Sequence, residues 1–142
     1  MVGQPGETGT NAKGSQMPVI FVFGSNLAGR HGAGAALFAF QNHGAIYGQG
    51  RGLQGKSYAI PTKDEKLQTR KLEDIAKDVD EFIKFAQSYP ELKFNVTPIG
   101  TGLAGLSHEE MAPLFKNVPD NCILCSLWKD IIFDLKNEEL PI

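Results

Sequence analysis

The sequence Val19-Ile-Phe-Val-Phe-Gly-Ser-Asn26 continues as Leu27-Ala-Gly-Arg-His-Gly-Ala-Gly-Ala-Ala36, and this stretch decides the fold. The five apolar residues Val19–Phe23 predict a strand that is buried on both faces. Polar Asn26 marks the carboxyl end of this strand, and glycines lead from it into a helix expected over Ala33–Asn42. Ligands of open α/β sheets bind beyond the carboxyl ends of the strands, so the stretch predicts a ligand-binding loop.

Strands and helices alternate along the rest of the chain, which predicts an α/β domain with a mixed or largely parallel sheet covered by helices. The strongest helix pattern runs from Leu72 to Ala86, with apolar residues at three- and four-residue spacing. In the first helix, Leu37 and Phe40 have the spacing of buried residues. The other expected elements are strands at Tyr58–Ile60 (closed by Pro61), Phe94–Ile99 and Cys122–Leu127, a loop over Gly48–Gly55, and a helix opened by a capping box of Ser107 and Glu110.

One domain is expected at residues 18–142, because a chain of 142 residues is too short for two comfortable cores. Residues 1–17 are polar and are expected to form a flexible leader. They lack the apolar core of a signal peptide, and no apolar run approaches the roughly 18 residues that a membrane span needs. Cys122 and Cys125 are expected to be buried, reduced thiols on a core strand, which favours a cytoplasmic protein.

The net charge of -2 argues against sequence-independent binding of nucleic acid or of an anionic membrane, since both need an excess of Lys and Arg. A single C-x-x-C is a poor zinc site, so neither a metal nor a cofactor is expected. The 16 glycines are concentrated in Gly24–Gly55 and Gly100–Gly105. Such clusters indicate positions where the backbone needs unusual dihedral angles or comes close to a ligand.

Two of the glycine motifs match well-known nucleotide-binding patterns. Gly50–Ser57 reads G-R-G-L-Q-G-K-S, but a P-loop must continue into a helix, whereas Ser57 continues into the extended segment Tyr58–Pro61. We therefore set the nucleoside triphosphatase interpretation aside. Gly100–Gly105 reads G-T-G-L-A-G and lies too far along the chain for a dinucleotide-binding fold. It predicts either an anion-binding loop at a helix N-terminus or a tight turn without a ligand.

Three segments resemble the macrodomains. Asn26–Ala35 resembles their first ligand loop, an Asn followed by His-Gly-Gly-Gly and a helix, and Asn26 precedes His31 by five residues as in the viral members. Gly100–Leu106 resembles their second phosphate loop, and Ile60–Lys63 resembles a strand end of the terminal ADP-ribose protein glycohydrolase branch. The resemblance covers about Val19–Leu127. It implies a single three-layer domain with a mixed central sheet flanked by helices, as in a phage or bacterial member of the family.

The resemblance also implies roles for individual residues. Asn26 would bind the hydroxyls of the distal ribose, and Lys63 would occupy the position of the catalytic Lys that attacks C1″ of that ribose. His31 is a third catalytic candidate, and it is equally well explained as a solvent-exposed loop residue. The backbone of the two loops would hold the diphosphate. The implied ligand-binding residues are Ser25, Asn26, Gly32, Ala33, Gly34, Gly100, Thr101, Gly102, Leu103, Ala104 and Gly105.

One departure bears on activity: the glycohydrolase branch has an Asp where this chain has Ala104. Without that acid, hydrolysis of a Lys63 adduct has no obvious general base. We therefore expect a protein that binds ADP-ribose or an ADP-ribose-derived nucleotide as a sensor or sequestering protein, with ADP-ribosylated protein as a further partner. The alternatives are an ADP-ribosyl hydrolase or ADP-ribose 1″-phosphate phosphatase of weak or absent activity, and a ligand-free structural or interaction protein, for example a phage-associated one.

Overall fold

The fold is taken from a computed structural model that describes residues 18–138, so the leader expected at residues 1–17 lies outside the described residues. Its strands are β1 (Val19–Asn26), β2 (Gly52–Gln54), β3 (Ser57–Lys63), β4 (Lys93–Val96) and β5 (Cys122–Ile123). They form one sheet in the order β2-β3-β1-β4-β5. Strand β1 pairs in parallel with β3 and β4, and β4 pairs in parallel with β5, whereas β2 is antiparallel to β3. The predicted mixed sheet is confirmed.

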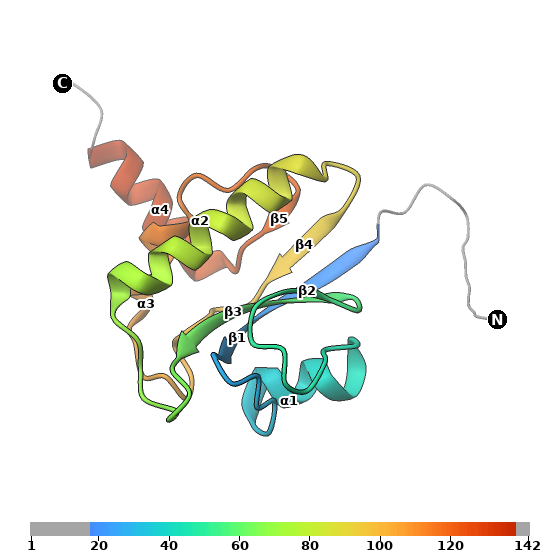
Figure 1. The fold of residues 1–142 in the computed structure, drawn as a ribbon. Helices are drawn as coiled ribbons and strands as arrows, with labels where there is room; N and C mark the ends of the chain where they lie inside the picture. Colours follow the sequence, from blue (N-terminus) through green and yellow to red (C-terminus); the bar gives the residue numbers. More distant parts are fainter. Residues whose placement is uncertain (1–17, 139–142) are drawn as a thin grey trace.

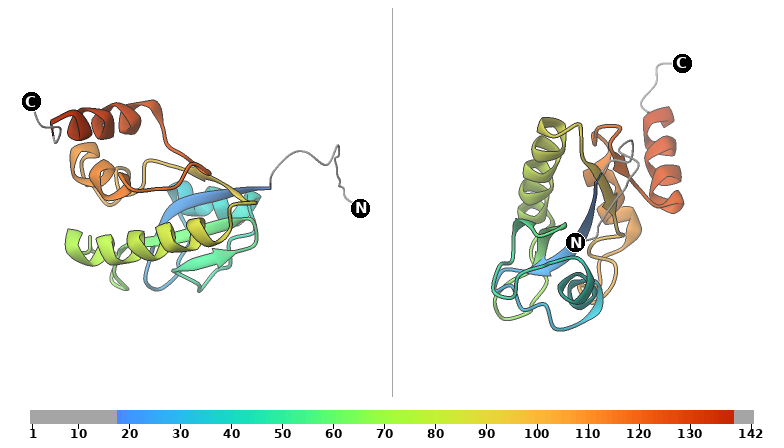
Figure 2. Two further views of the ribbon diagram at one scale, coloured as in Figure 1. Left: turned by 90° about the horizontal axis from the view of Figure 1, so that it is seen from above. Right: turned by 90° about the vertical axis from the view of Figure 1, so that its right-hand side faces the viewer.

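Helices cover both faces of the sheet and give the domain three layers (Figure 1, Figure 2). Helix α1 (Gly34–Asn42) packs on one face through a small core of Phe23, Ala36, Ala39, Ala45 and Ala59. A larger core on the other face is covered by α2 (Leu72–Ser88), α3 (His108–Met111), the 3-10 turn η1 (Ala112–Phe115) and α4 (Ser126–Glu138). Within residues 18–138 no helix has the length and apolar character needed to cross a membrane.

Strand β1 lies at the centre of the sheet and contributes side chains to both cores. Ile20 and Val22 belong to the larger core, and Phe23 belongs to the smaller core under α1. All three are at most 5% exposed. The prediction of a strand buried on both faces is therefore confirmed for the inner part of Val19–Phe23, while Val19 itself is exposed.

Two of the sequence patterns correspond closely to the structure. Of the apolar residues of α2 that were expected to face the core, those from Ile75 to Ala86 at helical spacing are buried, and Leu72 is partly buried. The capping box is also present, because Ser107 Oγ accepts from Glu110 N–H at 3.0 Å and Glu110 Oε1 accepts from Ser107 N–H at 2.9 Å. These local signals succeed because each depends on residues only three or four positions apart.

The prediction for the buried face of α1 was wrong. Leu37 and Phe40 were expected to point into the core, but Phe40 is exposed and Leu37 is only partly buried. The buried residues are Ala36 and Ala39. Small side chains at these positions let the helix lie close to the sheet, so the larger apolar residues point sideways and outward.

Four expectations about strands need correction. The strand expected over Phe94–Ile99 is β4, which begins at Lys93 and ends at Val96. The segment Gly48–Gly55 contains strand β2 rather than loop alone, and Pro61 does not close β3, which continues to Lys63. Pro61 is tolerated because β2 pairs with β3 only as far as Ala59, so the missing N–H faces an edge without a ladder partner. As predicted, Ser57 begins a strand and not a helix, which removes the structural context of a P-loop.

The expected strand Cys122–Leu127 is also much shorter than predicted. Strand β5 stops at Ile123, and α4 begins at Ser126. Cys122 and Cys125 are free thiols and are half-buried rather than fully buried. Burial raises the pKa of Cys122 to about 12, so this thiol stays protonated and unreactive near neutral pH.

An ion triad fixes α2 to the end of β3. Asp78 of α2 accepts hydrogen bonds from Arg51 Nε at 2.6 Å and from Arg70 Nη1 at 2.7 Å. Arg70 also donates to the carbonyl of Pro61 at 2.8 Å, two residues before Lys63. Burial alone would raise the pKa of Asp78, but the hydrogen bonds and charges of the two arginines outweigh it and hold this pKa below its ordinary value.

Replacing Asp78 by Ala should lower the free energy of unfolding by about 2 kcal/mol at pH 7, because Arg70 loses its partner in a largely buried position. Since the folded-state pKa is lowered, the contribution of the carboxylate is complete above about pH 4 and is lost as the pH falls through the folded-state value. Urea denaturation of wild type and Asp78→Ala across this range should therefore converge at low pH. Asp80→Ala on the exposed side of the same helix should change stability by less than about 0.5 kcal/mol, and an equal loss in both variants would contradict the assignment.

Candidate functional site

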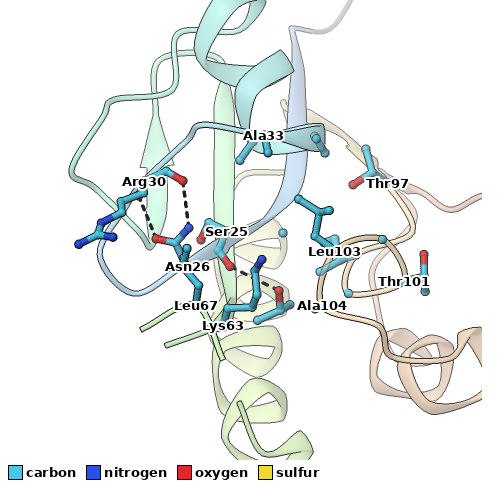
Figure 3. Close-up of a pocket in the computed structure, with 18 of the residues that line it drawn as sticks. Ser25, Asn26, Arg30, Ala33, Lys63, Leu67, Thr97, Thr101, Leu103 and Ala104 are labelled. Atoms are coloured by element: carbon cyan, nitrogen blue, oxygen red, sulfur yellow. Dashed lines mark hydrogen bonds between the residues drawn. The ribbon is translucent and has the colours of Figure 1, made fainter. Parts of the chain in front are cut away.

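A cleft of about 720 Å³ opens where the carboxyl ends of β1 and β4 lie side by side. This volume is typical of a site for a small organic ligand. The loop that leaves β1 forms one wall, the loop that leaves β4 forms another, and the end of β3 closes the space between them (Figure 3). Residues of both glycine-rich loops therefore line one cleft.

Most of the residues implied by the sequence line this cleft. They are Ser25, Asn26, Gly32, Ala33, Gly34, Lys63, Gly100, Thr101, Gly102, Leu103 and Ala104. His31 and Gly105 are not among the lining residues. The structure thus brings the two loops and the end of β3 together, whereas His31 is buried behind the cleft and Gly105 is exposed outside it.

The side chain of Asn26 closes the first loop on itself. Its Oδ1 accepts from the backbone N–H of Arg30 at 2.9 Å, and its Nδ2 donates to the carbonyl of Arg30 at 2.9 Å. The backbone carbonyl of Asn26 also accepts from Gly29 N–H at 2.9 Å. Asn26 is 5% exposed, so its first role is to hold the loop in shape. A ligand can bond only to the amide N–H and the Oδ1 lone pair that the bonds to Arg30 do not use.

Gly50 supports this loop from behind through direct backbone packing. A Cβ atom at Gly50 would lie 2.2 Å from the carbonyl oxygen of Asn26, so no side chain fits. The hydroxyl of Ser25 donates to the carbonyl of Gly50, so this hydroxyl is engaged within the protein and is not available to a ligand. The motif Gly50–Ser57 therefore serves the site as a structural support for the end of β1 rather than as a phosphate loop.

His31 is fully buried, which contradicts the expectation of a solvent-exposed loop residue. Its Nε2 lies 3.0 Å from the carbonyl oxygen of Gln49 and 3.1 Å from Oε1 of Gln54. Because Gln54 Oε1 already accepts from Ile46 N–H at 2.8 Å, both neighbours of Nε2 are acceptors. Nε2 must therefore carry a proton, and His31 holds the first loop to the segment 46–54 instead of facing the cleft.

The first wall of the cleft includes backbone N–H groups at the start of α1, which are suited to bind an anion. Helix α1 begins at Gly34 without a side-chain cap, and Gly34, Ala35 and Ala36 all line the cleft. The first N–H groups of a helix have no partner within the helix and carry its positive dipole end. Gly34 has φ +58°, a conformation that only glycine adopts easily, and a Cβ there would meet the Leu103 side chain at 3.5 Å. The two loops therefore approach each other at this point.

The second loop presents a similar set of donors. Two backbone hydrogen bonds close its turns. Gly105 N–H donates to the Gly102 carbonyl at 3.0 Å, and Leu106 N–H donates to the Gly100 carbonyl at 2.9 Å. The hydroxyl of Thr101 donates to the Pro98 carbonyl at 2.7 Å, so this side chain is used to shape the loop. The N–H groups of Gly102, Leu103 and Ala104 have no hydrogen-bond partner among residues 18–138.

The charged residues that line the cleft, Arg30 and Lys63, are both cations. Lys63 pairs with Asn26 across the strands after a register shift at Ser25/Asn26, and its carbonyl accepts from Leu27 N–H at 2.9 Å. In Figure 3 its amine points between Asn26 and Ala104, whereas the Arg30 guanidinium points away. Neither cation has an ion-pair partner in the described part of the chain. With cations and backbone donors on its walls, the cleft suits a phosphorylated ligand.

Several lining residues were not among the site residues predicted from the sequence, and Tyr47 and Leu67 are two of them. Tyr47 follows α1 and is exposed, and Leu67 lies in the turn after β3 with φ +63°. Leu67 takes this strained conformation in a turn where Asp64 Oδ1 accepts from the N–H groups of Lys66 and Gln68, at 2.9 and 3.0 Å. The only local signals were Gly48 after Tyr47 and Asp64 at the start of a polar segment, and neither marks a binding residue.

Gly50→Ala should destabilise the fold by about 3 kcal/mol, because its methyl group must displace the backbone at the end of β1. Chemical denaturation followed by circular dichroism measures this change. Gly32→Ala is the matched control, since a Cβ at Gly32 meets no atom within 4 Å and should change stability by less than about 0.5 kcal/mol. Equal stability of Gly50→Ala and wild type would show that the contact is not required.

Comparisons with known proteins identify the fold. No protein-family model matches the sequence, and no curated protein matches it either. Among solved structures, the macrodomain of DarG from Mycobacterium tuberculosis is similar, with a TM-score of 0.57 and 21% sequence identity. The similarity covers 82% of this chain and 93% of that macrodomain. The chain therefore has a macrodomain-like fold.

Proposed function

We propose that this protein binds ADP-ribose or an ADP-ribose-derived nucleotide in the cleft between its two glycine-rich loops, as a sensor or sequestering protein. The observation that carries the proposal is the convergence of two sets of free backbone N–H groups, at the start of α1 and at Gly102–Ala104, in one cleft. A diphosphate has acceptor oxygens on both of its phosphates and can accept from both walls. The cleft adds Lys63, and none of its lining residues within 18–138 carries a carboxylate.

The distal ribose would lie at the end of β3, close to Asn26 and Lys63. Both residues line the cleft, and they are register partners on adjacent parallel strands. The amide of Asn26 keeps one N–H and part of the Oδ1 acceptor capacity beyond its bonds to Arg30. A free sugar or a sugar attached to a protein side chain would fit the same position, so ADP-ribosylated protein is the macromolecular partner that we infer.

A second candidate function is hydrolysis of the ADP-ribosyl bond, and the position of Lys63 favours it. In the step that the family resemblance implies, the unprotonated amine attacks C1″, and the bond from C1″ to the carboxylate oxygen of the modified side chain breaks. The carboxylate leaves with the electron pair, and a water must then release the adduct with the help of a general base. Ala104 offers no such base, and Asp64 is occupied by the turn that contains Leu67. Binding without efficient turnover is therefore the stronger proposal.

Binding is tested by calorimetry with ADP-ribose. Lys63→Ala should weaken the affinity about tenfold, because a charge-assisted hydrogen bond to the ligand is lost. Lys66→Ala, in the adjacent turn and outside the cleft, should leave the affinity within about twofold. No measurable binding by the wild-type protein would overturn the proposed function and favour the ligand-free structural alternative.

Turnover is tested with protein carrying ADP-ribose on carboxylates and with ADP-ribose 1″-phosphate. Ala104→Asp should create or raise release of ADP-ribose, since it places a carboxylate in the cleft beside Lys63. In that background Lys63→Arg should abolish the release while it keeps the positive charge. Rapid turnover by the wild type that survives Lys63→Arg would refute attack by the amine and would point to an oriented water.

A further inference from the structure

The hydroxyl of Thr69 forms a hydrogen bond across the cleft. Its Oγ1 donates to the backbone carbonyl of Ala104 at 2.7 Å, although the two residues are 35 positions apart in the sequence. Within residues 18–138 it is the one hydrogen bond that joins the second loop, Gly100–Leu106, to another segment. The other hydrogen bonds of this loop stay within it or return to Pro98 just before it. The position of the second loop in the cleft therefore depends on Thr69.

Thr69 belongs to a hairpin after β3 that is itself well fixed. Its backbone pairs with that of Lys63 in an antiparallel bridge. Next to this bridge, Arg70 N–H donates to the Thr62 carbonyl at 2.9 Å. The Arg70 guanidinium also binds Asp78 of α2 at 2.7 Å, which anchors the hairpin on a long helix. The Thr69 hydroxyl is therefore presented by a fixed element, and it holds the second loop rather than being held by it.

This arrangement connects Lys63 to the second loop through one residue. Thr69 is at once the bridge partner of Lys63 and the hydrogen-bond donor to Ala104. The amine of Lys63 points between Asn26 and Ala104 (Figure 3), and free backbone N–H groups lie on the second loop at Gly102–Ala104. Thr69 therefore sets the width of the gap between the cation of the cleft and these donors.

The bond of Thr69 has little to do with the stability of the fold. Thr69 is exposed and belongs to neither hydrophobic core. A hydrogen bond between exposed groups adds little net stability, because water competes for both partners. The geometry of the cleft explains a bond in this place better than the stability of the domain does.

We propose that Thr69 is a positioning residue that makes the cleft prefer a nucleoside diphosphate with a distal sugar over the nucleoside diphosphate alone. This inference rests on the proposed function, since it concerns the same cleft and the same ligand class. A diphosphate can accept from the donors at α1 and on the second loop, whereas the distal sugar must also reach Lys63. A preset gap favours the longer ligand, because the walls do not have to be brought together and ordered on binding.

The test is calorimetry with ADP-ribose and with ADP, which lacks the distal ribose. Thr69→Val removes the hydroxyl and keeps the shape of the side chain. It should weaken ADP-ribose binding about fivefold, the effect of one lost hydrogen bond, and leave ADP binding within about twofold. Thr69→Ser keeps the hydroxyl and should bind ADP-ribose as the wild type does. Gln68→Ala is the matched control, because Gln68 is the exposed neighbour in the same hairpin and does not line the cleft.

A double-mutant cycle shows whether Thr69 acts through Lys63. In the Lys63→Ala background, Thr69→Val should change ADP-ribose binding by less than about twofold, because the contact that the hydroxyl positions is already gone. A residue that only stabilises the fold would cause the same loss in both backgrounds. Thermal unfolding followed by circular dichroism should place the midpoint of Thr69→Val within about 4 °C of the wild type.

The outcomes separate the two proposals. ADP-ribose binding that is unchanged in Thr69→Val, or a loss of equal size for ADP, would overturn the role of Thr69 and leave the proposed function intact. A full loss that persists in the Lys63→Ala background would overturn this role as well. Absence of any ADP-ribose binding by the wild type would overturn the proposed function and this inference together.

Discussion

The contact between Gly50 and the carboxyl end of β1 is the constraint on which the cleft depends. Backbone lies directly on backbone there, and the Ser25 hydroxyl adds a bond to the Gly50 carbonyl. With the strand end held from behind, Asn26 can close the first loop onto Arg30, and His31 can be buried against Gln49 and Gln54. The N-terminus of α1 then faces the cleft because the loop before it has a fixed shape.

The second requirement is the parallel pairing of β1 with both of its neighbours. Parallel strands bring their carboxyl ends to the same edge of a sheet, so the end of β3 with Lys63 and the loop after β4 meet the first loop there. Most polar side chains at this edge form hydrogen bonds to the backbone of the loops, as Ser25, Asn26 and Thr101 do. What remains for a ligand is mainly backbone N–H groups and the amine of Lys63, a combination that favours phosphate.

The hydrogen bonds that hold the loops also limit which groups are available for catalysis. A hydrolase needs a base near the reacting carbon, and the residues closest in sequence to Lys63 and Ala104 are used elsewhere. Asp64 shapes the turn beneath Leu67, and the Ala104 carbonyl accepts from the hydroxyl of Thr69 at 2.7 Å. That bond also links the segment after β3 to the second loop across the cleft. Under the proposed function, a carboxylate at position 104 is therefore the smallest change that would add acid–base chemistry.

The sequence by itself determined the α/β class, the central buried strand, helix α2 and the capping box at Ser107, because these depend on residues close together in the chain. It also placed Asn26, Lys63 and both glycine loops at one site, through order and resemblance. Only the tertiary structure decided that Ala36 and Ala39 face the core, that His31 is buried, and that Tyr47 and Leu67 line the cleft. The physical reason is that these outcomes depend on how closely α1 approaches the sheet and on contacts between distant glycines, and no local periodicity encodes such distances.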